Sequence, residues 1–124
     1  MVDVVLGASA TSSIGAHLVP QLVAAGRTVK AASRSGDYPE SATVSAHKVD
    51  AADAEAVAAL LQGAARVFVT IGVDYPKWPT VFPPIIDGVL AACKATKTPL
   101  IFCDNVFLIA GSNPSQMCCA RLPY

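Results

Sequence analysis

Charge is scarce in this chain. Only 15% of its 124 residues are Asp, Glu, Lys or Arg, and nine acidic residues balance nine basic ones. A formal net charge of zero leaves no basic footprint of the kind that binds nucleic acid or an anionic membrane. We therefore expect neither nucleic acid nor a membrane among its partners.

Long apolar runs and a basic leader are also missing. The sequence is 53% hydrophobic, yet its apolar stretches fall far short of the roughly 20 residues that cross a bilayer. No basic segment precedes the apolar run at the N-terminus, as it would in a signal peptide. The cysteines show no metal-ligand spacing, so we expect no metal site and a reducing, cytoplasmic setting; they are Cys93, Cys103, Cys118 and Cys119.

The stretch over residues 2–33 organises the chain. Residues 2–6 form a β-branched run typical of a strand covered on both faces, and a turn of small residues follows. Polar residues 11–13 are candidate N-caps for a helix predicted over residues 14–25. Free amides at such a helix start attract anions, so the turn predicts a pyrophosphate site.

The glycines of this turn support that interpretation but do not prove it. Gly7 would allow a tight exit from the strand, and Gly15 would let the helix pack closely against the sheet. Their spacing of eight is irregular, and Ala10 stands at the middle position where glycine is usual. The alternative is a turn that merely joins strand to helix.

The next strand, predicted over residues 29–32, ends in Ser33, Arg34 and Ser35. At this position an acidic residue binds the ribose 2′-hydroxyl of NAD, whereas arginine can pair with the 2′-phosphate of NADP. Hydroxyls and a guanidinium therefore favour NADP(H), with NAD(H) as the second candidate. The alternative is a solvated arginine in a turn.

Three further strands are predicted, over residues 43–49, 67–71 and 99–103, with a helix over residues 54–62. Asp50 follows the first of them and could either hold the adenine amino group or cap a turn. Residues 73–84 are rich in proline and aromatics, which favours a stiff, extended path with a helix beginning at Pro84.

This order of elements predicts an α/β fold in three layers, a Rossmann-like doubly wound parallel sheet of about five strands in the order 3-2-1-4-5. We expect an NAD(P)-binding domain over residues 1–111 and an irregular tail over 112–124. No catalytic residue is predicted. The predicted cofactor-binding residues are Gly7, Ser9, Ala10, Ser12, Ser13, Ile14, Gly15, Ser33, Arg34, Ser35, Asp50, Ala51, Thr70, Ile71 and Gly72.

Several motifs together resemble the NAD(P)-binding half of the short-chain dehydrogenase/reductase superfamily, in its extended or atypical branch of NAD-dependent epimerases and dehydratases. They are GASATSSIG, AASRS, the aspartates at positions 50 and 53, YPKWPTVFPPIIDGVLAACKA and LIFCDNVFLIAG. The resemblance covers residues 2–111 and implies a dinucleotide ligand in an oxidoreductase or epimerase.

The chain departs from that superfamily in its catalytic residues. Relatives similar to it carry Asp-Asn-Leu-Tyr-x-Tyr-Gly after the fifth strand, where this chain has residues 104–111 with Phe107 at the first tyrosine. The superfamily's Tyr-x-x-x-Lys pair has no match, because Tyr124 is the last residue. We therefore expect a truncated reductase that binds cofactor without turnover on its own. The alternative is a non-catalytic NADP(H)-sensing or protein-interaction module.

The predicted fifth strand would form an apolar edge of the sheet. Residues 100–103 read LIFC, and an unpaired apolar edge is a template for pairing with another chain. We therefore expect that a homodimer could form through the last strand or the last helix.

Overall fold

A five-stranded parallel sheet forms the centre of the molecule in a computed structural model, which describes residues 1–103. The strands lie in the order β3-β2-β1-β4-β5 and all pair in parallel. This confirms the predicted Rossmann-like α/β fold. In chain order the elements are β1 (Val2–Leu6), α1 (Gly15–Ala24), β2 (Thr28–Ser33), β3 (Val44–Lys48), α2 (Ala54–Leu61), β4 (Arg66–Val69), the 3-10 turn η1 (Tyr75–Lys77), α3 (Trp78–Thr96) and β5 (Leu100–Phe102).

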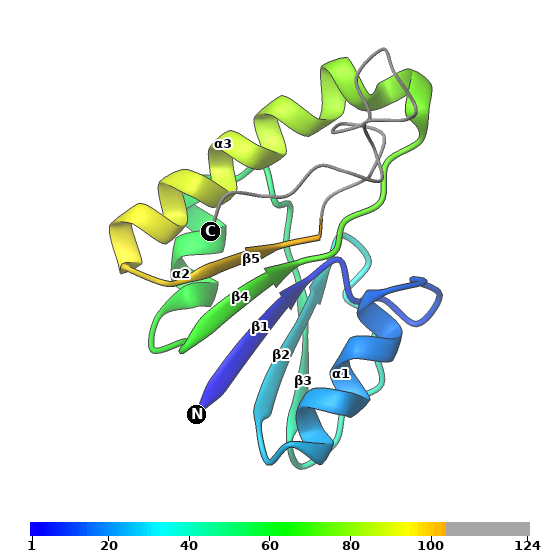
Figure 1. Cartoon of the computed structure of the whole chain (residues 1–124), viewed down its shortest axis with the longest axis vertical. Coiled ribbons are helices and arrows are strands. Elements are labelled where there is room, and N and C mark those ends of the chain that lie inside the picture. The colour runs from blue at the N-terminus through cyan, green and yellow to red at the C-terminus, as the bar shows by residue number, and fades with distance from the viewer. Residues whose placement is uncertain (104–124) are drawn as a thin grey trace, which may run out of the picture.

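Helices cover both faces of this sheet (Figure 1), with α1 on one side and α2 and α3 on the other. Successive side chains of β1 divide between the two cores. Val4 and Leu6 pack in the cluster under α2 and α3, whereas Val5 packs in the cluster under α1. All three are essentially inaccessible to solvent, which explains why β1 is an apolar run without polar alternation.

The chain path reverses direction at the boundary between β1 and β4. From β1 it moves through β2 to β3 on one side, and then crosses to β4 and β5 on the other. In open parallel sheets a crevice forms at such a switch point, outside the carboxyl ends of the strands. The fold therefore places the turns after β1, β2, β3 and β4 around one site.

The segment around η1 and α3 differs from the sequence-based prediction. Residues 73–84 do not run extended into a helix that begins at Pro84, because α3 already begins at Trp78 and carries Pro83 and Pro84 inside it. Pro79 in its first turn costs no backbone bond. The Trp78 indole N–H donates to the Val73 carbonyl at 2.5 Å. Its ring meets Phe82 one turn later, edge to face, with centroids 5.5 Å apart.

The other predicted elements agree with the structure to within two residues at each end, which is the usual uncertainty of element ends. Several predictions fall outside the described residues: the segment 104–111 with Phe107, and the tail of residues 112–124 with Tyr124. Within residues 1–103, no helix is both long and apolar enough to cross a membrane.

The amino edge of the sheet is closed by an ionic cluster. Asp3 on β1 is fully buried. Arg27 donates to it through two nitrogens, with its Nε 2.8 Å from Asp3 Oδ2, and Arg66 Nε lies 3.1 Å from Oδ1. Burial by itself raises the pKa of Asp3, but the hydrogen bonds and charges of the two arginines outweigh it and lower that pKa below its ordinary value.

Candidate functional site

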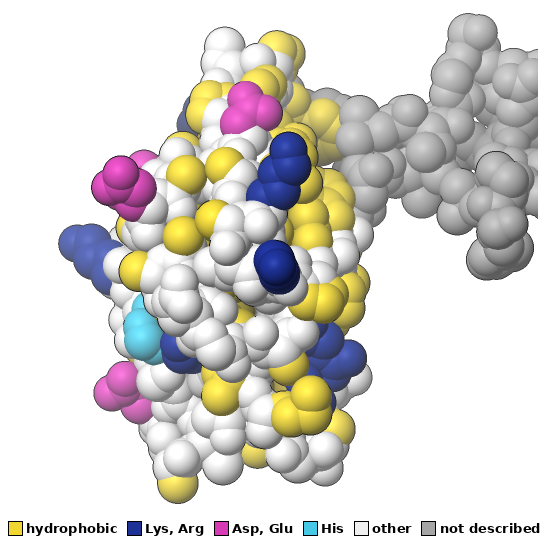
Figure 2. All heavy atoms as spheres, turned by 90° about the vertical axis from the view of Figure 1, so that its left-hand side faces the viewer, with side chains coloured by type: hydrophobic (Ala, Val, Ile, Leu, Met, Phe, Trp, Pro, Cys, Tyr) yellow, Lys and Arg dark blue, Asp and Glu magenta, His cyan; other side chains and the backbone are white. Residues whose placement is uncertain are grey.

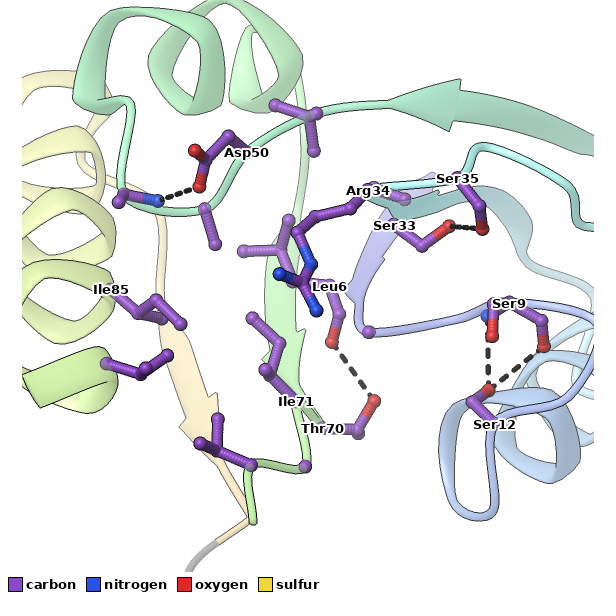
Figure 3. A pocket seen from close by; sticks show the side chains of 18 of the residues that line it. Leu6, Ser9, Ser12, Ser33, Arg34, Ser35, Asp50, Thr70, Ile71 and Ile85 are labelled. Atoms are coloured by element: carbon purple, nitrogen blue, oxygen red, sulfur yellow. Dashed lines mark hydrogen bonds between the residues drawn. The ribbon is translucent and has the colours of Figure 1, made fainter. Parts of the chain in front are cut away.

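A cavity of about 700 Å³ opens at the carboxyl edge of the sheet (Figure 3). This volume lies within the range of roughly 300–1,000 Å³ that is typical of small-molecule and cofactor sites. All predicted site residues line it except Ala10, Ile14 and Gly15; the lining members are Gly7, Ser9, Ser12, Ser13, Ser33, Arg34, Ser35, Asp50, Ala51, Thr70, Ile71 and Gly72.

Two glycines bring the turn after β1, the end of β4 and the start of α1 together. Gly7 has φ +97°, and a Cβ there would lie 2.8 Å from the backbone nitrogen of Ile71. A Cβ on Gly15 would lie 2.6 Å from the carbonyl oxygen of Gly7. Only glycine fits at these two positions. The irregular spacing of eight therefore still produces a close approach of α1 to the turn.

Ser12 organises the turn from inside. Its Oγ accepts from the amides of Ser9 at 3.1 Å and Ala16 at 3.0 Å, and donates to the Ser9 carbonyl at 3.0 Å. The residue before α1 is Ile14, which makes no side-chain cap. The predicted capping by residues 11–13 is therefore achieved by Ser12 alone, from within the turn rather than at the N-cap position.

The amides of this turn divide into two groups. Those of Ser9, Ala10 and Ser12 donate to Ser12 Oγ, to Asp37 Oδ1 and to the Ser9 carbonyl, respectively. Within residues 1–103, those of Thr11, Ser13 and Ile14 donate to no protein acceptor. Ser13 lines the cavity. Free amides beside the N-terminus of α1 are the donors that an anionic group of a ligand requires.

Three predicted residues lie around the cavity without lining it. Ala10 points its amide to Asp37, and Ile14 is half exposed. Gly15 is buried against the turn. Gly15 therefore shapes the site by permitting close packing.

The end of β2 contributes the cationic group of the cavity. The Arg34 side chain is exposed and extends into the space between Asp50 and Ile71 (Figure 3). Among the described residues it forms no salt bridge. Beside it, the hydroxyls of Ser33 and Ser35 lie 3.2 Å apart. This end of the cavity therefore combines an unpaired guanidinium with two hydroxyl groups.

Asp37 is a residue of this region that the sequence analysis missed. Its Oδ1 accepts from Ser35 Oγ at 2.7 Å and from the Ala10 amide at 3.3 Å. The Ser35 bond and then the Ala10 bond lower the pKa of Asp37 below its ordinary value. The Gly-Asp pair that follows Ser33–Ser35 could have indicated a turn back toward the first loop.

The loop after β3 meets α3 at the opposite side of the cavity. Asp50 Oδ1 accepts from the Ala52 amide at 3.0 Å, so Asp50 does cap a turn while it also lines the cavity. A Cβ on Gly88 of α3 would lie 2.7 Å from the carbonyl oxygen of Ala51. Gly88 thus lets α3 approach this loop and close the cavity.

The end of β4 is tied to the end of β1. The amide and the hydroxyl of Thr70 both donate to the Leu6 carbonyl, at 2.8 Å and 3.0 Å. Gly72 has open space around it, with no atom within 4 Å of a built Cβ. Thr70 therefore holds the end of β4 against the end of β1, and Gly72 leaves the space beside it unfilled.

The apolar wall of the cavity went largely unpredicted. Residues 81, 84 and 85 are spaced three and four apart, and they would have been recognised as one helix face had α3 been predicted to begin at Trp78. The additional lining residues are Leu6, Ala32, Val49, Ala52, Val73, Val81, Pro84 and Ile85.

Charge and metal ligands are sparse on the described part of the chain. On the face that lies to the left in Figure 1, which Figure 2 shows, acidic and basic side chains are interspersed with apolar ones. Within residues 1–103, no three His, Cys, Asp or Glu side chains are placed to hold a metal ion. Among residues 1–103, those that line the cavity include neither tyrosine nor lysine.

Comparison with known families gives one match that covers most of the chain. The family described as NAD(P)H-binding matches residues 9–110. That range includes the free amides of the turn, the end of β2 and the whole of α3. No curated protein matches the sequence.

Several solved structures share the fold of this chain. A mutant uronate dehydrogenase from Agrobacterium tumefaciens, complexed with NAD, has a TM-score of 0.71 at 18% identity, covering 86% of this chain and 42% of that one. The oxidoreductase ylbE from Lactococcus lactis has a TM-score of 0.78 at 17% identity, covering 91% and 52%. Vestitone reductase from alfalfa has a TM-score of 0.65 at 20% identity, covering 82% and 35%.

These likenesses establish the fold at the level of architecture. The chain spans about half, or less, of the length of each of these structures. The family match concerns cofactor binding.

Proposed function

The chain belongs to the NAD(P)H-binding family, and from that premise we propose that it binds NADP(H) in the cavity at the carboxyl edge of its sheet. The observation that carries the proposal is the unpaired Arg34 guanidinium, which extends into the cavity next to two hydroxyl groups. A guanidinium beside the Ser33 hydroxyl suits a phosphate ester on the adenosine ribose. NAD(H), which lacks that phosphate, is the weaker ligand in this proposal.

The other lining residues fit the remaining parts of a dinucleotide. The free amide of Ser13, which lines the cavity beside the positive end of α1, would donate to the pyrophosphate. Asp50 keeps a second carboxylate oxygen beyond the one that accepts from Ala52, and this oxygen would accept from the adenine amino group. When bound, the nicotinamide ring of such a cofactor gives or takes a hydride.

We propose further that residues 1–111 form a cofactor-binding domain that does not turn over a substrate by itself. Support comes from the described part of the cavity lining, within residues 1–103, which offers no tyrosine or lysine to transfer a proton. As an oxidoreductase or epimerase domain it would rely on groups from outside these residues. The second candidate, a sensing or interaction module, has the same cavity and is favoured by exposed apolar side chains at β5.

Two copies are proposed to associate along β5 or α3. Ile101 and Phe102 on β5, with Leu90 on α3, are between 38% and 48% exposed, and β5 is an edge strand of the described sheet. A concentration-dependent mass in light scattering supports this proposal, and a monomer at high concentration contradicts it. A cytoplasmic location is proposed with it, and Cys93 and Cys103 form no disulfide within residues 1–103.

Separate titrations with NADPH and NADH, followed by calorimetry or cofactor fluorescence, test the main proposal. We expect saturable binding of both, with NADPH the tighter. Arg34→Ala should weaken NADPH about tenfold or more, because a hydrogen bond to a charged group contributes roughly 1.5–3 kcal/mol, and should change NADH less than about threefold.

The matched control is Lys94→Ala, which removes one positive charge from an exposed position outside the cavity lining. It should leave both affinities unchanged. Absence of binding by either dinucleotide contradicts the proposal, and turnover of a carbonyl substrate by the chain alone contradicts the proposal that it is inactive by itself.

A further inference from the structure

Two consecutive prolines lie inside α3. Pro83 and Pro84 follow its first turn, and the helix continues through them from Trp78 to Thr96. Proline has no backbone N–H, and inside a helix its ring crowds the carbonyl of the residue four positions earlier. The pair therefore opposes helix formation, and local features that oppose the fold are expected at functional positions.

The two prolines deprive the Thr80 carbonyl of its helical donors. In an α-helix this oxygen would accept from the amide of residue 84, and in a 3-10 turn from that of residue 83. Both positions are proline. The Thr80 hydroxyl is directed elsewhere, because it donates to the Lys77 carbonyl at 3.1 Å. The Thr80 carbonyl can therefore accept from a ligand without losing either of these helical bonds.

This carbonyl lies on the side of α3 that faces the cavity. A helical carbonyl points along the axis toward the residue four positions later, and for Thr80 that residue is Pro84, which lines the cavity. Gly88 follows one turn beyond Pro84, and a Cβ there would lie 2.7 Å from the carbonyl oxygen of Ala51. The same side of α3 thus faces the cavity and the loop after β3.

A second acceptor, Asp50, belongs to this end of the cavity. Asp50 on the loop after β3 and Ile85 on α3 lie on one side, across the cavity from Ser9 and Ser12 (Figure 3). One carboxylate oxygen of Asp50 accepts from the Ala52 amide, which leaves the other oxygen for a ligand. A ligand group that satisfies both this oxygen and the Thr80 carbonyl needs two N–H donors.

We propose that the Thr80 carbonyl is a second acceptor for the exocyclic amino group of the adenine base, beside Asp50. This inference rests on the proposed function. The amino group carries two N–H donors and can satisfy both oxygens, whereas hypoxanthine has a carbonyl oxygen at the same position. A site built to accept from a ligand donor rejects an analogue without it, because the oxygens of the site are then left unpaired.

Pro84→Leu tests the role of the carbonyl and keeps an apolar side chain in the cavity lining. The new N–H at position 84 would donate to the Thr80 carbonyl within the helix. Calorimetry measures two dissociation constants, that of the NADPH analogue with hypoxanthine in place of adenine and that of NADPH. We expect their ratio to exceed about tenfold in the wild type, and to fall about three- to tenfold in Pro84→Leu, as for the loss of one hydrogen bond.

The matched control is Pro83→Leu. Pro83 is exposed and does not line the cavity, and a new N–H there would donate to the Pro79 carbonyl, four positions earlier. The ratio should stay at its wild-type value. Thermal unfolding of both variants verifies that the fold is retained. An equal fall of the ratio in both variants would show that the altered helix is responsible and would overturn the inference.

The Thr80 carbonyl can also be observed directly in the wild type. In a carbon-13-labelled chain, NADPH should shift the resonance of this carbonyl, because a new hydrogen bond polarises it. The hypoxanthine analogue at saturation should shift it much less. Equal shifts with both ligands, or no shift with NADPH, contradict the inference.

The outcomes separate this inference from the proposed function. If the wild-type chain binds NADPH but the ratio is near one, or stays unchanged in Pro84→Leu, the role of Thr80 is wrong and the proposed function stands. If the wild-type chain binds no dinucleotide, the proposed function fails and the role of Thr80 fails with it. A ratio that falls in Pro84→Leu and not in Pro83→Leu supports the inference.

Discussion

The two edges of the same sheet use charge in opposite ways. At the amino edge Asp3 is fully buried and accepts from both Arg27 and Arg66. At the carboxyl edge Arg34 is exposed, lines a cavity and has no salt-bridge partner within residues 1–103. The charge of Asp3 is paired within the protein and stabilises the fold. The charge of Arg34 has no partner within residues 1–103 and is available to a ligand.

Helix direction explains why the open edge is the carboxyl one. In a parallel sheet each connecting helix begins near the carboxyl ends of the strands, so its positive end and its free amides collect there. The amino edge receives helix C-termini and short returns, such as residues 25–27 between α1 and β2. The two edges should therefore respond differently to substitution.

The largest effect is expected at the closed edge. Asp3→Ala should lower the free energy of unfolding by about 3 kcal/mol, because it leaves two arginines without the carboxylate that neutralises them. Urea denaturation measures the loss. Dinucleotide affinity of the folded protein should stay the same, and a weaker affinity without a loss of stability would contradict the division between the edges.

A smaller effect is expected where the fold shapes the open edge. Gly15→Ala places a Cβ 2.6 Å from the Gly7 carbonyl oxygen, so the turn must shift, at a cost of about 1–3 kcal/mol. Both stability and affinity should fall. Gly72→Ala is the control for stability, because nothing lies within 4 Å of its Cβ; an equal loss of stability in both variants would refute the steric explanation.

Acid should weaken the closed edge in a defined direction. The pKa of Asp3 in the folded chain is below its ordinary value of 3.8, so its contribution to stability is complete above that value and is lost as the pH falls below it. The wild type should lose up to about 1.4 kcal/mol more per pH unit than Asp3→Asn does. Denaturation curves between pH 5 and pH 2 measure the difference, and parallel curves would show that Asp3 is not the responsible group.

The smallest change in stability is expected for Asp53, which differs from Asp50 at the same edge in its role. Asp53 caps α2 by accepting from the Ala56 amide at 3.2 Å, and Asp53→Ala should cost about 1 kcal/mol of stability without changing affinity. Asp50 lines the cavity, so Asp50→Ala should weaken binding of both dinucleotides. Titration and thermal unfolding of the two variants check this, and a loss of affinity in Asp53→Ala would blur the distinction.

The linear pattern was sufficient for most of the architecture. The apolar run of residues 2–6, the small-residue turn and the alternation of strands with helices lead to the strand order, because right-handed crossovers leave few topologies. The start of α3 was mispredicted because Pro83 and Pro84 usually break helices, whereas here contacts of Trp78 with Val73 and Phe82 accompany the first turn.

The candidate site, like the fold, was predicted in part from the sequence. Strand polarity follows from chain order, so the linear pattern predicts which strand ends meet at one edge and that Ser33, Arg34 and Asp50 lie there. Tertiary packing settled which amides of the first turn stay free and that Asp37 returns to Ala10. It also decided that Gly88 brings α3 against the loop after β3. These contacts join residues 27 to 37 positions apart, and their distances depend on packing, which no local pattern encodes.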